Sequence, residues 1–337
     1  MIKALTNRLV LVGLTFFISA CGQQPKLISL SGETMGTTYH IKMVPGERVP
    51  NQQLLQAEID LALEQINNQM STYRNNSELS KFNQLRLNET VTVSADTALV
   101  IQEGIDLYHK TDGALDITLG PLVNLWGFGP DKRPTSIPSQ TLIDTTKAKT
   151  GIEHLHLDGL KLRKAIPDLY VDLSSIAKGF GVDKVAQILS RYQPKGYLVE
   201  IGGELSLYGV KADDTPWRVA IEQPDVDERQ VQLVIEPGNV AMATSGDYRN
   251  YYEEEGRRFS HLIDPRDGYP IDHHLASVTV LHPQSMVADG YATALMVLGV
   301  EKSLQLAKEE QLAIMLIEKQ ADGFKVHYSD AFKPYVN

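Results

Sequence analysis

Cysteine is nearly absent from this sequence, since Cys21 is the only one among 337 residues. No disulfide can therefore form within one molecule. The sequence also lacks the cysteine and histidine spacings of zinc sites, a Ser-His-Asp pattern and the phosphate-binding motif G-x-x-x-x-G-K-[ST]. These absences argue against a structural zinc centre, a protein nucleophile and a P-loop.

Positive charge is also scarce, with 32 Lys and Arg against 42 Asp and Glu and a formal net charge of −10. Residues 1–20 carry two basic and no acidic side chains, so the chain without them is more negative still. Such a protein is not expected to bind nucleic acid. A nucleotide would need a metal ion or backbone dipoles to offset repulsion at its phosphates.

One strongly apolar run, residues 9–17, lies near the N-terminus, after Lys3 and Arg8 and before the sequence ISAC. We interpret residues 1–20 as a secretory signal peptide rather than a membrane span. Cys21 follows directly, as in the lipobox of a bacterial lipoprotein, and would carry several acyl chains, palmitate among them, as a membrane anchor. The alternative is an ordinary cleaved signal with an incidental thiol.

The rest of the chain is expected to hold a short polar tether, residues 21–31, and one domain, residues 32–337. Apolar residues recur at helical spacing in 54–70, and Ser94 is a plausible N-cap for a further helix. Short β-branched segments dominate the second half, interrupted by helical segments at 178–191, 285–298 and 301–309, and the chain ends in a hairpin that turns at Asp322-Gly323. The expected class is α+β, with a mostly antiparallel sheet core and flanking helices.

Asp289 and Thr293 stand four residues apart in the apolar segment ADGYATALMVLG, residues 288–299. Four residues are about one helical turn, so the two oxygens would lie side by side. A carboxylate and a hydroxyl form half of a Mg²⁺ site, because Mg²⁺ keeps waters and takes its remaining ligands from phosphates. From the spacing alone, Asp289 as the cap of a helix that begins there is the simpler interpretation.

Lys178 lies in VDLSSIAKGFGVDKV, residues 171–185, which is typical of a small-residue turn leading into an amphipathic helix. The N-terminus of such a helix offers N–H groups and a positive dipole to a phosphate, and Lys178 would add a charge. The alternative is a plain capped helix.

Three other segments mix glycine with aromatic or polar residues: 33–41, 70–83 and 111–130. Gly36, Gly113 and Gly120 could let a ligand approach the backbone, and Tyr73 and Trp126 offer aromatic faces. For each segment alone, turn chemistry and core packing are the simpler explanation. His261, in SHLIDPRDGYPI, is a candidate general base, although a lone histidine on a strand is more often only hydrogen-bonded in place.

Taken together, six separated motifs resemble the ApbE family of FAD:protein FMN transferases, from about Gly32 to the last expected strand. They read TMGTTY, MSTYRNNSELSKFN, TDGALDITLGPLVNLWGFG, DLSSIAKGFGVD, TSGDYRNYY with SHLIDPRDGYPI, and ADGYATALMVLG. The resemblance implies an ApbE-like (T-fold-like) architecture.

The resemblance also implies a reaction, in which FAD binds with Mg²⁺ and a threonine hydroxyl of a client protein attacks the FMN-side phosphorus, releasing AMP. Implied clients are subunits of the Na⁺-translocating NADH:quinone reductase or the Rnf complex that carry a Ser/Thr-Gly-Ala-Ser/Thr type of motif. The expected location is the periplasmic side of the bacterial inner membrane, although Gly22 after Cys21 leaves the outer membrane open.

By position in the motifs, the resemblance assigns metal ligation to Asp289, Thr293 and the backbone carbonyl of Ser175. It assigns proton acceptance from the incoming threonine to His261 and phosphate neutralisation to Lys178. Its FAD contacts are Met35, Tyr73, Ala114, Leu115, Asp116, Asp172, Lys178 and Ile263. Some relatives have an acidic residue where this chain has Ala292.

Two other functions are compatible with the sequence. One is an FAD pyrophosphatase that uses water as the acceptor and gives FMN and AMP. The other is a non-catalytic periplasmic lipoprotein that binds flavin.

Overall fold

The computed structural model describes residues 26–130, 136–224, 230–247, 251–254 and 256–336. The expected signal peptide and Cys21 lie outside these residues. Among the residues described, no helix combines the length and apolar character needed to cross a bilayer.

An eight-stranded sheet forms the centre of the molecule, and each neighbouring pair of strands is antiparallel. The expected α+β class with a mostly antiparallel core is therefore confirmed. The strands follow the order β1 (Ile28–Thr34), β2 (Thr37–Val44), β6 (Gly196–Ile201), β7 (Glu204–Gly209), β10 (Ala241–Gly246), β13 (Leu275–His282), β14 (Ala313–Gln320) and β15 (Gly323–Tyr328).

The first strand corrects the expected start of the domain. β1 begins at Ile28 and pairs with β2 along its length, from Ile28 opposite Met43 to Thr34 opposite Thr37. Residues 28–31, expected as tether, are therefore part of the sheet. Ile28 and Leu30 point into the core while Ser29 and Ser31 are exposed, which is the period of two of a half-buried strand.

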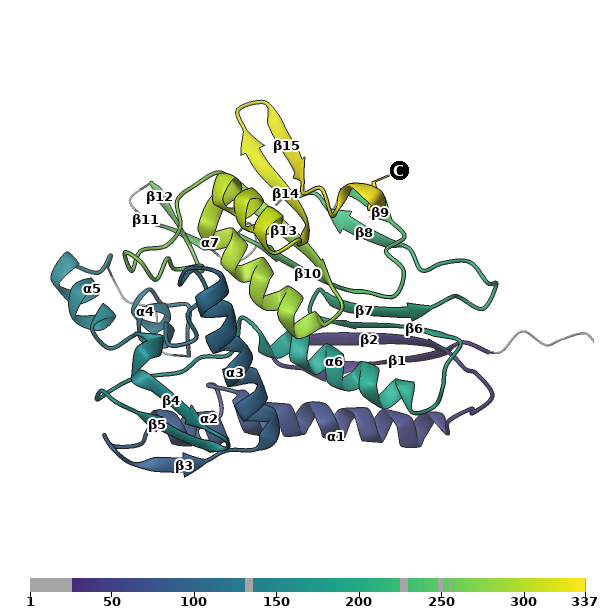
Figure 1. Cartoon of the computed structure of the whole chain (residues 1–337), viewed down its shortest axis with the longest axis horizontal. Helices are drawn as coiled ribbons and strands as arrows, with labels where there is room; N and C mark the ends of the chain where they lie inside the picture. The colour runs from purple at the N-terminus through teal and green to yellow at the C-terminus, as the bar shows by residue number, and fades with distance from the viewer. Residues whose placement is uncertain (1–25, 131–135, 225–229, 248–250, 255, 337) are drawn as a thin grey trace, which may run out of the picture.

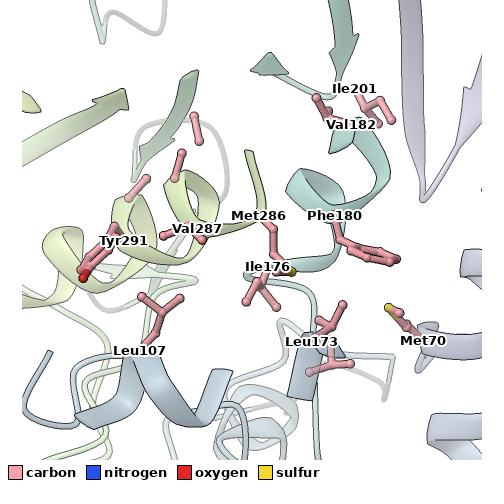
Figure 2. Packing of buried hydrophobic residues seen from close by; sticks show 14 of the residues in the cluster. Met70, Leu107, Leu173, Ile176, Phe180, Val182, Ile201, Met286, Val287 and Tyr291 are labelled. Carbon is pink, nitrogen blue, oxygen red and sulfur yellow. The ribbon is translucent and has the colours of Figure 1, made fainter. Parts of the chain in front are cut away.

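Three long helices cover one face of the sheet (Figure 1): α1 (Gln52–Met70), α6 (Ala177–Ser190) and α7 (Ser285–Glu309). A fourth, α3 (Ala95–Lys110), packs against α7 and α1 at one end of this helical layer. The expected helices at 285–298 and 301–309 form α7, which is interrupted at Gly299 (φ 76°, ψ 179°). Figure 2 shows how Ile176 and Phe180 of the α6 region and Met286 of α7 gather in the core.

The other face of the sheet is covered by a two-stranded ribbon, β8 (Val219–Glu222) with β9 (Val231–Ile235), and by the C-terminal turn η2 (Lys333–Tyr335). β14 shows why both faces are apolar. Its Ile314 and Leu316 join the helical side, while Met315 and Ile317 join the ribbon side. A strand buried on both faces has no polar alternation.

Smaller elements surround one end of the helical layer. They are α2 (Glu78–Asn83), the three-stranded sheet β3 (Thr90–Thr92), β5 (Lys161–Lys164) and β4 (Leu155–Asp158), the helices α4 (Gly120–Leu125) and α5 (Gln140–Lys147), the turn η1 (Ile152–His154), and the hairpin β11 (Tyr251–Glu254) with β12 (Arg257–Ser260). α4, α5 and the β11–β12 hairpin share an aromatic core around Trp126, which is fully buried and donates to the Gly268 carbonyl at 2.9 Å. Trp126 is therefore a core residue and not an open ring for a ligand.

Candidate functional site

The N-terminal parts of α6 and α7 lie in direct backbone contact. A Cβ added to Gly179 would lie 2.4 Å from the carbonyl oxygen of Ser285, so only glycine fits there. Asp183 on α6 accepts the backbone N–H groups of Ser285 (2.8 Å) and Met286 (2.9 Å), which lie in the first turn of α7. The two helices are thereby held in a fixed register.

Asp289 lies at the centre of this contact and is 2% exposed. Its Oδ2 accepts the N–H of Gly179 at 2.9 Å. α7 begins at Ser285, four residues earlier, so Asp289 does not cap its own helix as the simpler interpretation of the sequence held. It caps α6 instead, whose flanking residue Ile176 supplies no side-chain cap.

Lys178 is the cation nearest to Asp289, with 3.6 Å between Nζ and Oδ1. Its ammonium lies closer to Glu204 on β7, at 2.7 Å from Oε1. Burial acts to lower the pKa of Lys178, but Asp289 and Glu204 outweigh it and raise that pKa above the usual value, so the lysine stays charged. Burial raises the pKa of Asp289 and of Glu204, although Lys178 acts against the shift in both.

Thr293 lies one turn after Asp289 on α7, and its hydroxyl is 3.5 Å from the hydroxyl of Ser245 on β10. Ser175 precedes α6 in a turn. The N–H of Gly179, four residues later, points to Asp289 instead of completing a helical bond to the Ser175 carbonyl. Within the described chain, that carbonyl is left as an acceptor where α6 begins.

These donors fit a hard divalent cation. A buried carboxylate, a hydroxyl and a backbone carbonyl are oxygen ligands of the kind Mg²⁺ takes, and a site with one carboxylate leaves positions for waters and phosphate oxygens. No group of three or more His, Cys, Asp or Glu side chains in the described ranges could hold a metal ion. The described residues therefore do not form a metal site made only of carboxylates and imidazoles. A metal ion held by Asp289 would need oxygen ligands of other kinds, such as hydroxyls, carbonyls, waters or phosphates.

A cavity of about 1120 Å³ opens beside Lys178. Its walls are the β1–β2 turn, the C-terminal end of α1 with the loop to Arg74, and residues 172–178. The turn consists of Met35 (φ 50°) and Gly36 (φ 72°), the pair of positive φ angles of a tight hairpin. Asn67 on α1 donates to the Thr34 hydroxyl at 3.0 Å and fixes this wall.

Four of the residues assigned to FAD by the resemblance line this cavity: Met35, Tyr73, Asp172 and Lys178. Tyr73 is 69% exposed, so its ring is open to a ligand. Partial desolvation at the cavity wall, and then the charge of Asp172, raise the pKa of Tyr73. Asp172 accepts the N–H of Ser174 at 2.8 Å, while burial raises its pKa.

Three further assigned residues, Ala114, Leu115 and Asp116, lie on a neighbouring segment. The N–H of Asp172 donates to the Ile117 carbonyl at 2.8 Å, which joins the two segments. Asp116 accepts both the N–H and the hydroxyl of Thr118, at 2.8 and 2.6 Å, and burial raises its pKa. Ala114 and Leu115 are 2% exposed, and a Cβ on Gly290 of α7 would lie 3.4 Å from Leu115, so Leu115 packs against Gly290, the residue after Asp289 on α7.

Ile263 and His261 lie in the aromatic region around Trp126. Ile263 is 3% exposed, and the His261 ring lies edge-on to Phe128 with 6.3 Å between centroids. Among the described residues that line the large cavity, neither of these two appears, nor do Ala114, Leu115 and Asp116. The structure thus gathers the residues that the resemblance assigns to the metal and the phosphates near the α6–α7 contact and leaves His261 on the β12 side.

Two residues of the site escaped the sequence analysis. Glu204 lies at the start of a strand after Gly202-Gly203, where a carboxylate is usually a turn residue, and only its burial (3% exposed) shows otherwise. Asp183 resembles any acidic residue on an amphipathic helix, since its partners are 102 and 103 residues away. Gly120, by contrast, makes room for the Tyr170 ring, 2.2 Å from where its Cβ would be, and not for a ligand.

Comparisons with known proteins agree with this geometry. The model of the ApbE family matches residues 35–316. A protein of Vibrio cholerae serotype O1 named FAD:protein FMN transferase is 50% identical over 331 residues, covering 98% of this chain and 99% of the relative. The protein of that name from Haemophilus influenzae is 48% identical over 338 residues, 98% of each chain.

Solved structures give the same result. The flavin transferase ApbE from Vibrio cholerae superimposes with a TM-score of 0.87 at 51% identity, over 92% of this chain and 99% of that one. The Pseudomonas stutzeri flavinyl transferase ApbE, in its apo form, gives 0.85 at 42% identity, over 92% and 97%. From the matched motifs, the shared fold and this near-complete coverage, the chain belongs to the ApbE family.

Proposed function

We propose that this protein transfers FMN from FAD to a threonine hydroxyl of a client protein, with Mg²⁺ held by Asp289, Thr293 and the Ser175 carbonyl. Relatives that match nearly the whole chain are named for this transfer of FMN from FAD to a protein. The metal, the acceptor residue and the clients are the finer parts of the proposal. The observation that carries it is the buried Asp289 carboxylate, 3.6 Å from a lysine that lines a cavity large enough for a dinucleotide.

The charges of the site support a phosphate-containing substrate bound with a cation. Lys178 shares its one positive charge with two buried carboxyl groups, so the cluster offers little net positive charge to an anionic pyrophosphate. Mg²⁺ would supply positive charge locally and neutralise charge that builds up on the phosphate oxygens during transfer.

The chain's own residues bind and orient the reactants. Tyr73 and Met35 offer an exposed ring and a thioether to the flavin, and Asp172, held by Ser174, offers a fixed acceptor. Lys178 reaches the cavity with a charge that its surroundings maintain. The hydroxyl that attacks comes from the client, which is consistent with the lack of a protein nucleophile motif.

His261 is the proposed acceptor of the threonine proton. It directly follows Ser260, the last residue of β12, and lies against Phe128, on another segment from the residues that line the large cavity. We propose that this side admits the acceptor segment, whose motif would be of the Ser/Thr-Gly-Ala-Ser/Thr type.

The clients we propose are membrane redox subunits, such as those of the Na⁺-translocating NADH:quinone reductase or the Rnf complex. The sequence motif at Cys21, which lies outside the described residues, supports a lipid anchor on the periplasmic side of the inner membrane. Such an anchor would bring the enzyme to clients in the same membrane.

Incubation with FAD, Mg²⁺ and a client domain that carries the threonine motif tests the function. Flavin fluorescence that stays with the denatured client, absent when the threonine is replaced by valine, is the expected result. Release of free FMN and AMP without labelled client would instead support an FAD pyrophosphatase. Bound but unchanged FAD would support a flavin-binding protein.

A further inference from the structure

Glu204 is a buried carboxylate that the proposed reaction leaves without a role. It begins β7 and is 3% exposed. Its Oε1 accepts the Lys178 ammonium at 2.7 Å, while its Oε2 is buried and has no hydrogen-bond partner among the described residues. A buried charged oxygen without a partner costs free energy, so a benefit elsewhere must retain it.

The turn before Glu204 places this carboxylate beside Lys178. Gly202 and Gly203 have φ angles of 61° and 109°, which side chains with a Cβ rarely adopt. A Cβ on Gly202 would lie 3.4 Å from Cδ of Lys178 and 2.8 Å from Cγ2 of Thr37. The bare turn thus leaves space for the lysine stem to pass toward Glu204.

Two buried carboxylates lie within 4 Å of the Lys178 ammonium. Its Nζ is 2.7 Å from Glu204 but 3.6 Å from Asp289, so the close ion pair is with Glu204. The Oδ1 of Asp289 faces this more distant ammonium, and its Oδ2 accepts a hydrogen bond from the Gly179 N–H. Without Glu204, Asp289 would be the only buried carboxylate that pairs with the ammonium among the residues the structure describes, and a direct pair would form in a region where charge interactions are weakly screened.

We propose that Glu204 is a positioning residue that holds the Lys178 ammonium away from Asp289 and so keeps that carboxylate available to a divalent cation. This inference rests on the proposed function, since it concerns the same metal site. Lys178 then stays at the cavity wall, where its ammonium could bind a phosphate, and does not block the Asp289 oxygen that would bind the metal.

Mn²⁺ binding to the metal-free full chain, measured by electron paramagnetic resonance, tests the proposal without measuring activity. Glu204→Gln is expected to weaken Mn²⁺ binding by about tenfold or more, in the range found when a group that orients a metal ligand is removed. Lys178→Met removes the competing ammonium and is expected to bind at least as tightly as the wild type. The double variant is expected to match Lys178→Met.

The double variant separates positioning from a folding defect, because it leaves no ammonium to compete and no Glu204 carboxylate that has lost its partner. Glu200→Gln is the matched control: Glu200 lies on β6, accepts the Gly203 N–H through an oxygen that glutamine retains, and should bind Mn²⁺ as the wild type does. Unchanged affinity in Glu204→Gln would overturn the proposal, as would a double variant that binds about tenfold more weakly than Lys178→Met. A wild-type protein that binds no Mn²⁺ would instead refute the proposed metal site itself.

Discussion

The Oδ2 oxygen of Asp289 accepts the backbone N–H of Gly179 at 2.9 Å, across the contact between α7 and α6. One oxygen of the proposed ligand is thereby fixed by a backbone group, and the carboxylate has little freedom to rotate. Metal ligands oriented by such hydrogen bonds bind more tightly than free ones. The packing of two helices and the geometry of the proposed site therefore depend on the same residue, Gly179.

Gly179→Ala is expected to lower stability and metal affinity together. Its Cβ would meet the backbone of Ser285 at 2.4 Å, which cannot move aside as a side chain can, so α6 and α7 must separate. The expected cost is about 1–3 kcal/mol of unfolding free energy. Urea unfolding and Mn²⁺ titration measure the two effects.

Gly181→Ala on the same helix is the control, since a Cβ there would meet the movable end of Met35 at 2.9 Å. It should cost less than Gly179→Ala. Equal losses in the two variants, or full Mn²⁺ affinity in Gly179→Ala, would contradict the coupling.

Removing the proposed carboxylate ligand should abolish transfer without unfolding the protein. Asp289→Ala leaves Lys178 paired with Glu204 at 2.7 Å but removes the cap on the Gly179 N–H, so the expected cost is about 1 kcal/mol of unfolding free energy. Thr293→Val keeps the side-chain shape and should weaken Mn²⁺ binding by about tenfold. Asp144→Ala, at an exposed carboxylate on α5, is the control and should leave transfer unchanged. Full transfer by Asp289→Ala would refute the assignment.

Asp183 should make stability depend on pH in an unusual direction. Burial raises its pKa to about 6 in the folded protein, against a usual value of 3.8, with Asp289 acting in the same sense. Between these pH values the folded state binds a proton that the unfolded state has lost, so stability falls as pH rises. The loss attributable to Asp183 is on the order of 3 kcal/mol and is complete above about pH 6.

Asp183→Asn keeps an acceptor for one N–H of α7 and cannot ionise. The difference in unfolding free energy between wild type and variant, measured by urea denaturation from about pH 4 to about pH 7, should therefore change in favour of the variant as pH rises. A difference that is constant over this range would show that Asp183 titrates normally.

Tyr73 should contribute to FAD binding and not to stability. Its side chain is 69% exposed and lines the cavity. Tyr73→Ala is expected to raise the KM for FAD by about three- to tenfold, the loss of one aromatic contact, with an unchanged melting temperature. Leu54→Ala, at a residue 70% exposed on α1 and outside the cavity lining, is the control. An unchanged KM in Tyr73→Ala would place the flavin elsewhere.

The sequence predicted those elements whose pattern is local. The helical spacing of 54–70, the break after 298 and the final hairpin all match the structure, since each is set by neighbours within a few turns. The order of the eight strands was not predictable, because β2 pairs with β6 over more than 150 residues and no local signal records that pairing. The strand β1 was missed because its apolar–polar alternation, Ile28 and Leu30 with two serines, ends after four residues at Gly32.

The site was predictable in parts for the same reason. Asp289 and Thr293 could be recognised from their four-residue spacing on one helix, α7. Lys178 could be recognised because it lies in the first turn of another helix, α6. Their contact through Gly179, and the pairing of Lys178 with Glu204, arise from segments 26 to 110 residues apart. The motifs of the resemblance contain most of the residues that line the cavity. They gave no indication that a second buried carboxylate, Glu204, forms an ion pair with Lys178.

The most direct test of the account is a crystal structure with FAD and Mn²⁺, in which anomalous scattering locates the ion. The account predicts one peak within bonding distance of the Asp289 carboxylate, the Thr293 hydroxyl and the Ser175 carbonyl, with the flavin ring against Tyr73 and its phosphates toward the ion. A flavin bound in another cavity, or a cofactor-bound protein with no metal at Asp289, would contradict it.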